Sequence, residues 1–305
     1  MHVVMTGGAG FLGSRLAREL LGAGSLAVAG GAPRALSRLT LVDRVPVPPD
    51  LAADSRVTVV LGDLADPGFA PDALAGAELI FHLAAAVSGE CEADFDLGLR
   101  ANLQATQALL ASCRALGTSP VVVFTSSVAI FGGSAGTVIT DDTWPVPQTS
   151  YGTQKVMCEY LLADYTRKGF LNGRAVRLMT VSVRPGRPNA AASGFLSGIV
   201  REPLASPAKA TGALLCAATA SDQAWGGRTA LTMPAMTLTV AQMAAALTRV
   251  AGPQVSALID WVPDPMITRM FDTWPARIRA DRAARLGLTP DPDFDSVIRA
   301  HLAES

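Results

Sequence analysis

A tyrosine and a lysine in the middle of the chain are placed so that they could act together. Tyr151 and Lys155 are four residues apart, so on a helix both side chains would lie on one face. A phenol whose pKa is about 10 is a poor base at neutral pH, and a nearby ammonium lowers that pKa toward the working range. The pair therefore predicts a general acid and base. A packed tyrosine beside a solvated lysine is the alternative.

A run of hydroxyl residues precedes this pair. Thr125-Ser126-Ser127 ends an apolar stretch that is typical of a buried strand. At the carboxyl edge of a sheet, the hydroxyl of Ser127 could hydrogen-bond the substrate oxygen that Tyr151 protonates or deprotonates. A turn or helix cap made by the serines is the alternative.

Glycines near the beginning of the chain predict a phosphate-binding turn. The run Thr6-Gly7-Gly8-Ala9-Gly10-Phe11-Leu12-Gly13 directly follows a strand pattern and opens a helical one. Glycines at these spacings allow a tight turn, let the backbone approach a pyrophosphate and let the helix pack closely on the strand. The exposed amides and the positive end of the helix then hold the phosphates. The position directly after the first strand disfavours an ordinary turn.

Two acidic residues follow later strands. Asp43 could accept hydrogen bonds from the hydroxyls of an adenosine ribose, which favours NAD over NADP because a carboxylate repels a 2′-phosphate. Arg44 beside it weakens that distinction, and a turn-initiating carboxylate is the alternative for Asp43. Asp63, which Leu64 follows, could contact the adenine amino group.

Short β-branched runs alternate with helical stretches along the first part of the chain. The predicted strands are 3–6, 39–43, 57–60, 79–82, 121–125 and 174–183, and the predicted helices include 12–23, 93–116 and 151–168. This alternation indicates right-handed βαβ units and a doubly wound, Rossmann-like α/β fold with a parallel sheet. We predict an NAD-binding domain over 1–183, with a helix near 208–220 returning to it. A smaller, less regular substrate lobe would comprise 184–207 and 221–305, with helices at 240–250, 276–286 and 294–301.

Composition excludes several classes of protein. Half of the 305 residues are hydrophobic and 17% are charged, which suits a sizeable core and not a disordered chain. The 25 Lys and Arg against 26 Asp and Glu leave no basic excess for nucleic acid or an anionic membrane. No apolar stretch reaches the roughly 18 residues of a membrane span. The four cysteines form no C-x-x-C pair, so we predict a cytoplasmic protein with free thiols.

The spacing of the histidines bears on metal binding. The chain has three histidines without metal-like spacing, so no metal site is predicted. His82, at the end of an apolar strand, is interpreted as a buried structural residue.

Four motifs together resemble the extended short-chain dehydrogenase/reductases. They are the glycine-rich turn, Phe81-His82-Leu83-Ala84-Ala85, Thr125-Ser126-Ser127 and Tyr151-x-x-x-Lys155. Further runs resemble members of that family that oxidise short sugar acids, and they extend the likeness over nearly the whole chain. These runs are 94–98, 124–133, 149–155, 184–193, 274–277 and 293–295.

The resemblance implies that NAD is the cofactor and that the C2 hydroxyl of a four-carbon sugar acid is oxidised to a 2-oxo acid. Tyr151 would take the hydroxyl proton while hydride leaves C2, Lys155 would hold the nicotinamide ribose, and Ser127 would orient the substrate. Asn102 would relay protons or hold its helix, and a capped or surface asparagine is the alternative. The implied cofactor contacts are Gly7, Gly10, Phe11, Leu12, Gly13, Asp43, Asp63, Leu64, Ala84, Ala85, Tyr151 and Lys155.

A sugar acid carries a carboxylate, whose binding requires hydrogen-bond donors in a closed site. The implied substrate contacts are Ser88, Ser127, Tyr151, Arg184, Arg187 and Asn189. Arg184 could equally be a structural cation. Compared with the family, the chain is shortened between 201–205 and 206–210, which predicts an intact cofactor site beside a more open substrate pocket.

Two other functions remain open at this point. A nucleotide-sugar epimerase or dehydratase uses the same tyrosine and serine, but it needs room for a nucleotide that a shortened lobe disfavours. A non-catalytic dinucleotide-binding protein is disfavoured because Tyr151, Lys155 and Ser127 occur together. The helices 93–116 and 151–168 are the ones that this family pairs in a homodimer, and ordinary core packing would explain their leucines as well.

Overall fold

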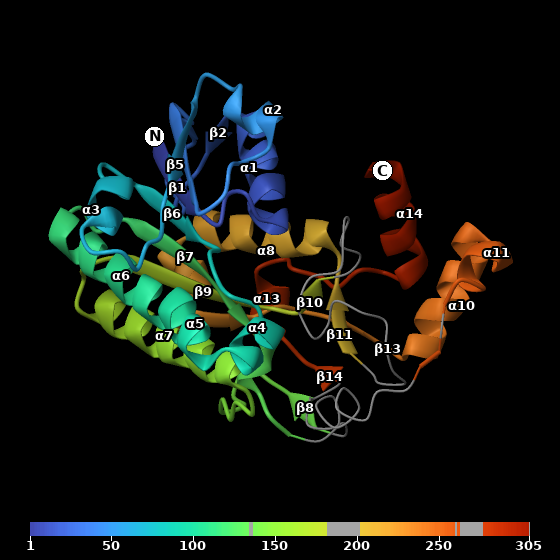
Figure 1. The fold of residues 1–305 in the computed structure, drawn as a ribbon. Coiled ribbons are helices and arrows are strands. Elements are labelled where there is room, and N and C mark those ends of the chain that lie inside the picture. Colours follow the sequence, from blue (N-terminus) through green and yellow to red (C-terminus); the bar gives the residue numbers. More distant parts are fainter. Residues whose placement is uncertain (134–136, 182–201, 260, 263–276, 305) are drawn as a thin grey trace.

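A parallel sheet lies at the centre of the molecule, with helices on both faces (Figure 1). The computed structural model describes residues 1–133, 137–181, 202–259, 261–262 and 277–304. The seven strands follow the order β12-β9-β7-β6-β1-β4-β5. They are β1 (His2–Thr6), β4 (Arg38–Asp43), β5 (Val57–Leu61), β6 (Leu79–His82), β7 (Val121–Ser127), β9 (Asn172–Leu178) and β12 (Ala230–Thr232). The chain winds outward from β1 in both directions, which confirms the predicted doubly wound α/β fold.

The direction of winding reverses between β1 and β6. β1 pairs in parallel with β4 on one side and with β6 on the other, and Thr6 lies opposite both Val42 and His82. Open α/β sheets bind their ligands at this switch point, outside the carboxyl ends of the strands. The glycine-rich turn after Thr6 and the segment after His82 therefore face each other where a ligand is expected.

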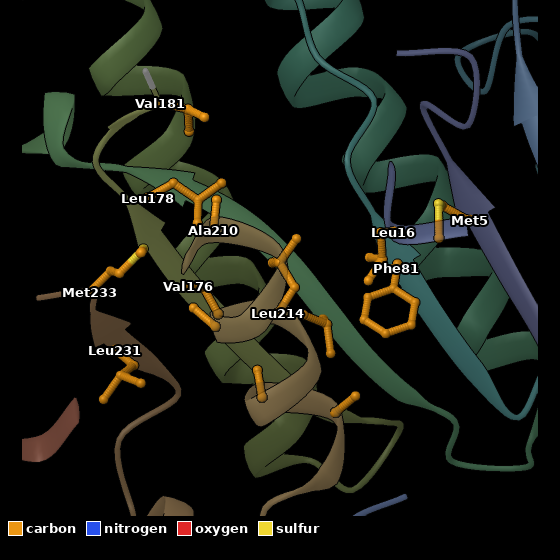
Figure 2. Packing of buried hydrophobic residues seen from close by; sticks show 14 of the residues in the cluster. Met5, Leu16, Phe81, Val176, Leu178, Val181, Ala210, Leu214, Leu231 and Met233 are labelled. Atoms are coloured by element: carbon orange, nitrogen blue, oxygen red, sulfur yellow. The ribbon is translucent and has the colours of Figure 1, made fainter. Parts of the chain in front are cut away.

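Alternate residues of each strand enter two separate cores, because successive side chains point to opposite faces of a sheet. Val3 and Met5 pack with α1 (Phe11–Ala23) and α8 (Pro207–Thr219), whereas Val4 packs with the helices of the other face. Those helices are α3 (Phe69–Ala73), α6 (Ala105–Leu116) and α7 (Ser150–Arg167). Figure 2 shows the first core, where Leu214 of α8 lies over the sheet.

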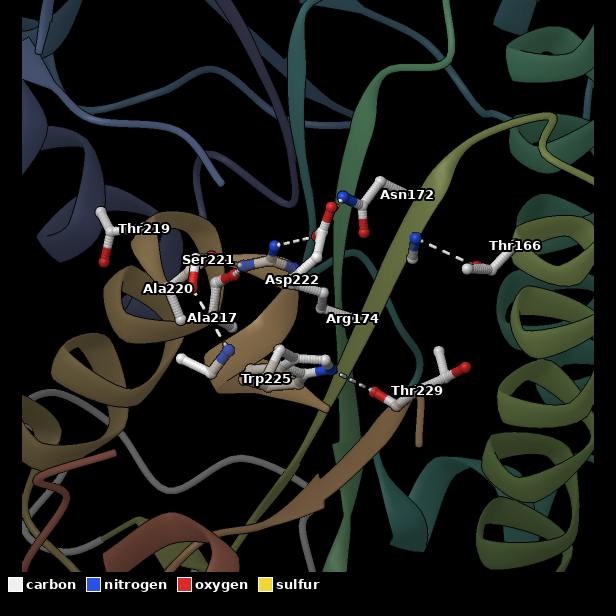
Figure 3. A network of polar contacts seen from close by, with 12 residues as sticks. Thr166, Asn172, Arg174, Ala217, Thr219, Ala220, Ser221, Asp222, Trp225 and Thr229 are labelled. Carbon is white, nitrogen blue, oxygen red and sulfur yellow. Dashed lines mark hydrogen bonds and ion pairs between the residues drawn. The ribbon is translucent and has the colours of Figure 1, made fainter. Parts of the chain in front are cut away.

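A buried arginine joins β9 to the end of α8 (Figure 3). Arg174 has no exposed surface and donates hydrogen bonds to the carbonyl oxygens of Ala217 (2.6 Å) and Ala220 (2.5 Å). It also donates to Asp222 (2.8 Å), the first residue of α9 (Asp222–Trp225), and its guanidinium carbon lies 5.5 Å from the centre of the Trp225 ring. The last carbonyls of a helix have no intrahelical donor, and this guanidinium supplies one.

A smaller lobe lies beside the carboxyl edge of the sheet. Its three-stranded sheet has the order β10 (Thr180–Val181), β11 (Glu202–Ala205) and β13 (Met236–Leu238). The helices α10 (Val240–Ala251) and α14 (Phe294–Glu304) pack on each other through Met243, Ala246, Phe294, Val297 and Ile298. The remaining elements here are α11 (Pro253–Ser256), α13 (Asp281–Arg285) and the pair formed by β8 (Val138–Ile139) and β14 (Arg277–Ile278).

Two predicted elements of the lobe are corrected. The predicted helix 276–286 is wrong at its beginning, because Arg277 and Ile278 pair with β8 and the helix starts only at Asp281. The predicted boundary at 221 placed residues 230–232 in the lobe, but they form β12, which pairs in parallel with β9 at the edge of the central sheet. In both cases the pairing partner is distant in the chain, so the local pattern could not indicate it.

The predicted helix 93–116 is divided into several pieces. α4 (Ser88–Ala93) ends before Asp94, whose carboxylate accepts from the amide of Leu97 (3.0 Å) and so caps α5 (Phe95–Gly98). A π-helical turn, η1 (Leu99–Gln104), then leads into α6. Such turns are rare and are often found at functional sites.

Several short elements connect the larger strands and helices. The 30-residue spacing between Gly13 and Asp43 contains the hairpin β2 (Ser25–Leu26) and β3 (Arg34–Ala35). α2 (Pro49–Ala52) precedes β5, and the 3-10 turn η2 (Val128–Ile130) follows β7. Among the helices that the structure describes, none is both long and apolar enough to cross a membrane.

Candidate active site

Two adjoining cavities form a cleft along the carboxyl edge of the sheet. One, of about 280 Å³, is lined by Asp43, Asp63, Leu64 and Ala84, and the other, of about 250 Å³, by Ser88, Ser127, Tyr151 and Lys155. They share Gly7, Gly10, Leu83 and Ala85, so the glycine-rich turn lies between them. Phe11, Leu12 and Gly13 also line the second cavity. The cleft thus brings together the residues predicted to contact both ends of a dinucleotide.

The glycines of the turn are required by close backbone contacts. Gly7 has a left-handed backbone (φ +74°), and a Cβ there would lie 2.7 Å from the amide nitrogen of Ala84. A Cβ on Gly13 would overlap the carbonyl oxygen of Gly7. Gly10 precedes α1, so the first amides of that helix open toward the cleft. A turn that leaves no room for side chains fits the pyrophosphate of NAD.

The two acidic residues of the first cavity are already hydrogen-bonded to backbone amides. The carboxylate of Asp43 accepts from the amide of Ala9 in the glycine-rich turn (2.9 Å) and from that of Arg44 (2.7 Å). Asp63 accepts from the amide of Ala65 (2.9 Å) and pairs with Arg100 (3.3 Å). Asp43 therefore caps its own turn, the alternative considered for it, and it also lines the first cavity.

The beginning of α7 positions Tyr151. The hydroxyl of Thr149 accepts from the amide of Gly152 (3.1 Å) and caps the helix. A Cβ on Gly152 would overlap the carbonyl oxygen of Ala129, so glycine lets the helix start directly against the turn that follows β7. This close approach places Tyr151 and Ser127 on the walls of one cavity.

Lys155 lies one turn further along the same helix and is almost completely buried. Its ammonium donates to the carbonyl oxygen of Thr125 (2.8 Å) and lies 5.6 Å from the centre of the Tyr151 ring. It also lies 4.8 Å from the centre of the Phe124 ring. Burial lowers the pKa of Lys155 to about 8, because a charge is poorly solvated inside the protein. The cation is therefore present at neutral pH and close to its titration.

The two serines at the end of β7 differ in their partners. The hydroxyl oxygen of Ser127 accepts from the amide of Ala129 (3.1 Å), which leaves its proton available to a ligand. Ser126 is buried, and its hydroxyl has no partner among the described residues.

Asn102 lies behind the cleft, in the π-helical turn. It is buried and is not among the described residues that line either cavity. Its side chain accepts from the amide of Ala86 (2.8 Å) and donates to the carbonyl of the same residue (3.3 Å). The side-chain amide of Gln154 lies 2.8 Å away. Asn102 thus holds the segment that lines the cavity, and no direct contact with a ligand is indicated.

The structure does not describe three of the predicted substrate contacts, and it adds cavity residues that were not predicted. Arg184, Arg187 and Asn189 lie outside the described residues. The second cavity is also lined by Leu178, Met179, Thr180 and Val181, and none of these was predicted as a site residue. They lie in the second half of the predicted strand 174–183, which is wrong as a single strand, because β9 ends at Leu178 and β10 pairs in the sheet of the lobe. Their position toward the carboxyl edge of the central sheet could have identified them.

Comparisons with known proteins show the family to which the chain belongs. The model of the NAD dependent epimerase/dehydratase family matches residues 3–220, and the chain belongs to this family. A protein of Cupriavidus necator named D-erythronate dehydrogenase is 47% identical over 323 aligned positions, which cover all of this chain and 99% of the relative. A second protein of that name, from Haemophilus influenzae, is 37% identical over 98% of each chain.

Solved structures agree with this assignment. A structure from Agrobacterium tumefaciens described as a nucleoside-diphosphate-sugar epimerase superposes with a TM-score of 0.91 at 40% identity, covering all of this chain and 94% of the other. The holo form of a GalE-like L-threonine dehydrogenase from Cupriavidus necator shares the fold, with a TM-score of 0.85 at 20% identity and coverage of 100% and 99%. Together the comparisons confirm the predicted family, the fold, the use of NAD and the class of NAD-dependent dehydrogenase.

Proposed function

We propose that this enzyme oxidises the C2 hydroxyl of D-erythronate to a 2-oxo acid. The observation that carries the proposal is the convergence of Tyr151, Lys155 and Ser127 on one cavity next to the glycine-rich turn. Relatives named D-erythronate dehydrogenase, which match this chain from end to end, supply the substrate.

NAD, when bound, accepts a hydride from the C2 carbon of the substrate. The glycine-rich turn and the first turn of α1 would hold its pyrophosphate, Asp43 its adenosine ribose, and Asp63 with Leu64 its adenine. Lys155 would hold the nicotinamide ribose. The backbone of Ala84 and Ala85 closes the cleft behind these groups.

The side chains of the second cavity handle the proton. Tyr151 takes the proton of the C2 hydroxyl, and the Lys155 ammonium favours the tyrosinate form that can accept it. Ser127, whose hydroxyl proton is available, donates to the same substrate oxygen and fixes its direction. Ser88 lines this cavity and would bind the acid portion together with Arg184, Arg187 and Asn189, which are proposed from the resemblance of their run alone.

Formation of NADH tests this function directly. We expect NADH fluorescence with D-erythronate in a panel of four- to six-carbon aldonic acids, and a loss of kcat/KM of at least about a hundredfold in Tyr151→Phe. Tyr165→Phe is the matched control, because Tyr165 lies on the same helix but packs against Phe170. NAD binding without turnover of any acid in the panel would contradict the proposal.

A nucleotide-sugar epimerase is the second candidate, because the Agrobacterium structure carries that description at 40% identity. An epimerase returns the hydride to its substrate, so it forms a new sugar without net NADH. Incubation with UDP- and dTDP-sugars, followed by chromatography, separates the two functions.

We also propose that the enzyme is a homodimer paired through α6 and α7. The outer face of α7 exposes the large apolar side chains of Met157 (42%) and Tyr160 (59%), whereas the opposite face of the helix is buried. Sedimentation of the wild type and of Tyr160→Glu tests this pairing.

A cytoplasmic location is proposed from the cysteines. All four are free, and Cys91, Cys113 and Cys158 are buried, as suits a reducing compartment. Fractionation of cells that express the native protein tests it.

A further inference from the structure

A buried histidine connects two strands and a helix behind the cofactor cleft. His82 is 1% exposed, and its Nδ1 lies 2.7 Å from the hydroxyl oxygen of Thr6. Its Nε2 lies 2.9 Å from the hydroxyl oxygen of Thr106. Both ring nitrogens are therefore engaged inside the protein, and none of these three residues lines either cavity described above.

The donors and acceptors around His82 can be assigned in one way. The hydroxyl of Thr106 donates to the carbonyl oxygen of Asn102 (2.6 Å), which uses its only proton. Toward His82 it must therefore accept, so Nε2 carries the ring proton. With Nδ1 unprotonated, the hydroxyl of Thr6 donates to it, and the oxygen of Thr6 accepts from the amide of Ala84 (3.3 Å).

This arrangement ties two walls of the cleft together. Thr6 directly precedes Gly7, and Ala84 is the residue whose backbone Gly7 approaches most closely. At the other end, Thr106 holds Asn102, whose side chain brackets the backbone of Ala86 on the wall of the second cavity. A hydrogen-bonded chain thus runs from the floor of the cofactor site to the wall of the substrate site.

We propose that His82, held as the neutral Nε2–H tautomer between Thr6 and Thr106, is a positioning residue that sets the spacing between the glycine-rich turn and the Asn102 turn. Its effect on NAD affinity does not depend on the identity of the substrate. Its effect on the substrate wall rests on the function proposed above.

The surroundings keep His82 uncharged. Burial lowers its pKa to about 3, and the nearby Lys155 ammonium acts in the same direction. The ring also stacks at a tilt on Phe124, with 5.6 Å between ring centres. An imidazolium would donate from both nitrogens, so the Thr6 oxygen would have to accept from Nδ1 and the proton of the Thr6 hydroxyl would lose its acceptor.

Replacement of Thr106 tests the proposal without removing the histidine. Thr106→Val keeps the shape of the side chain but leaves the Nε2 proton without an acceptor, and we expect the Kd of NAD to rise by about tenfold. Thr106→Ser restores the hydroxyl and should return the Kd to within about twofold of the wild type. The Kd is measured by calorimetry without substrate, so failure to oxidise D-erythronate does not affect the result.

Ser112→Ala is the matched control. Ser112 lies on the same helix and its buried hydroxyl also donates to the carbonyl four residues earlier, that of Ala108 (2.8 Å), but it does not touch His82. A purely structural role for Thr106 predicts that both variants lose thermal stability and neither loses NAD affinity. That outcome, in folded Thr106→Val, would overturn the proposal.

The tautomer can be observed directly. We expect ¹⁵N NMR of protein labelled at the histidine rings to show, near pH 7, one ring protonated at Nε2 and not at Nδ1, and to lose this signal in His82→Gln. The opposite tautomer or an imidazolium at His82 would also overturn the proposal.

Discussion

Among the residues that the structure describes, two cationic side chains are almost completely buried, one toward the amino ends of the strands and one at their carboxyl ends, and their surroundings differ. Arg174, toward the amino end of β9, donates to two carbonyls and a carboxylate and stacks near Trp225. Lys155, at the carboxyl edge, donates to a single carbonyl, that of Thr125, and faces the rings of Phe124 and Tyr151. The fold supplies Arg174 with three hydrogen-bond acceptors, whereas the Lys155 ammonium, which has three protons, donates to one acceptor among the described residues.

Under the function proposed above, this difference separates a structural charge, Arg174, from a functional one, Lys155. A buried charge is tolerated when hydrogen bonds replace its hydration, and Arg174 lacks a partner among the described residues only at Nε. The lowered pKa of Lys155 reflects incomplete compensation. Such a group costs stability, and under the function proposed above it would gain further partners from the cofactor and substrate.

Replacement of Lys155 should give the largest effect. Lys155→Met is expected to lower kcat/KM by at least about a hundredfold, because it removes the cation beside Tyr151. The same change should raise the free energy of unfolding at pH 7 by about 1–3 kcal/mol, since the pKa of Lys155 lies well below its ordinary value of 10.5.

The stability gain should depend on pH in a defined direction. The folded protein releases the Lys155 proton near pH 8, whereas the unfolded chain holds it until the pH approaches 10.5. The penalty is therefore complete below pH 8 and fades above it, so wild type and Lys155→Met converge in alkali. Denaturant unfolding at several pH values measures this, with Lys168→Met at the exposed end of α7 as the control. If Lys155→Met were less stable than the wild type, Lys155 would stabilise the fold as Arg174 does, and the two cations would not differ in this respect.

Replacement of Arg174 should affect stability and leave the site intact. Arg174→Met removes the donors that satisfy the end of α8, and we expect the free energy of unfolding to fall by about 2–4 kcal/mol. NAD affinity should change by less than about twofold, because Arg174 lies far from the cleft residues along β9. Arg167→Met, which breaks an exposed pair with Asp164, should cost less than about 1 kcal/mol. A weakened NAD affinity in Arg174→Met would show that the two ends of the sheet are coupled.

At acid pH, the burial of a third basic group, His82, should lower the free energy of unfolding. Its pKa falls from the ordinary 6.5 to about 3 in the folded protein. Below pH 6.5 the unfolded chain takes up a proton that the folded protein refuses, so stability should decrease by up to about 1.4 kcal/mol per pH unit toward pH 3. His82→Gln should flatten the slope between pH 6 and 4.5, whereas His2→Gln, at a partly buried histidine whose pKa is also lowered, should flatten it less. An equal slope in wild type and His82→Gln would mean that His82 is solvated when folded.

Sequence patterns predicted the elements that depend on local residues. Apolar runs located β1, β4, β5, β6 and β7 to within two residues at each end, and the glycine pattern located the turn that separates the two cavities. The residues 93–116 are predicted as one helix because their apolar spacing continues through the π-helical turn. In the structure Asp94 caps the short helix α5, and η1 packs against α7, which is distant in the chain. β12 and β14 were missed because a strand of two or three residues is defined by its partner, not by its own pattern.

The sequence by itself determined which chemical groups the site would contain: a phenol, an ammonium, a hydroxyl and a glycine turn, each readable from residue type and spacing. The tertiary structure alone decided how these groups are tuned. The burial of Lys155, the withdrawal of Asn102 behind the cleft and the proton position on His82 each depend on atoms of segments that are distant in the chain. Hydrogen-bond geometry and desolvation are set by such neighbours, so no local pattern carries them.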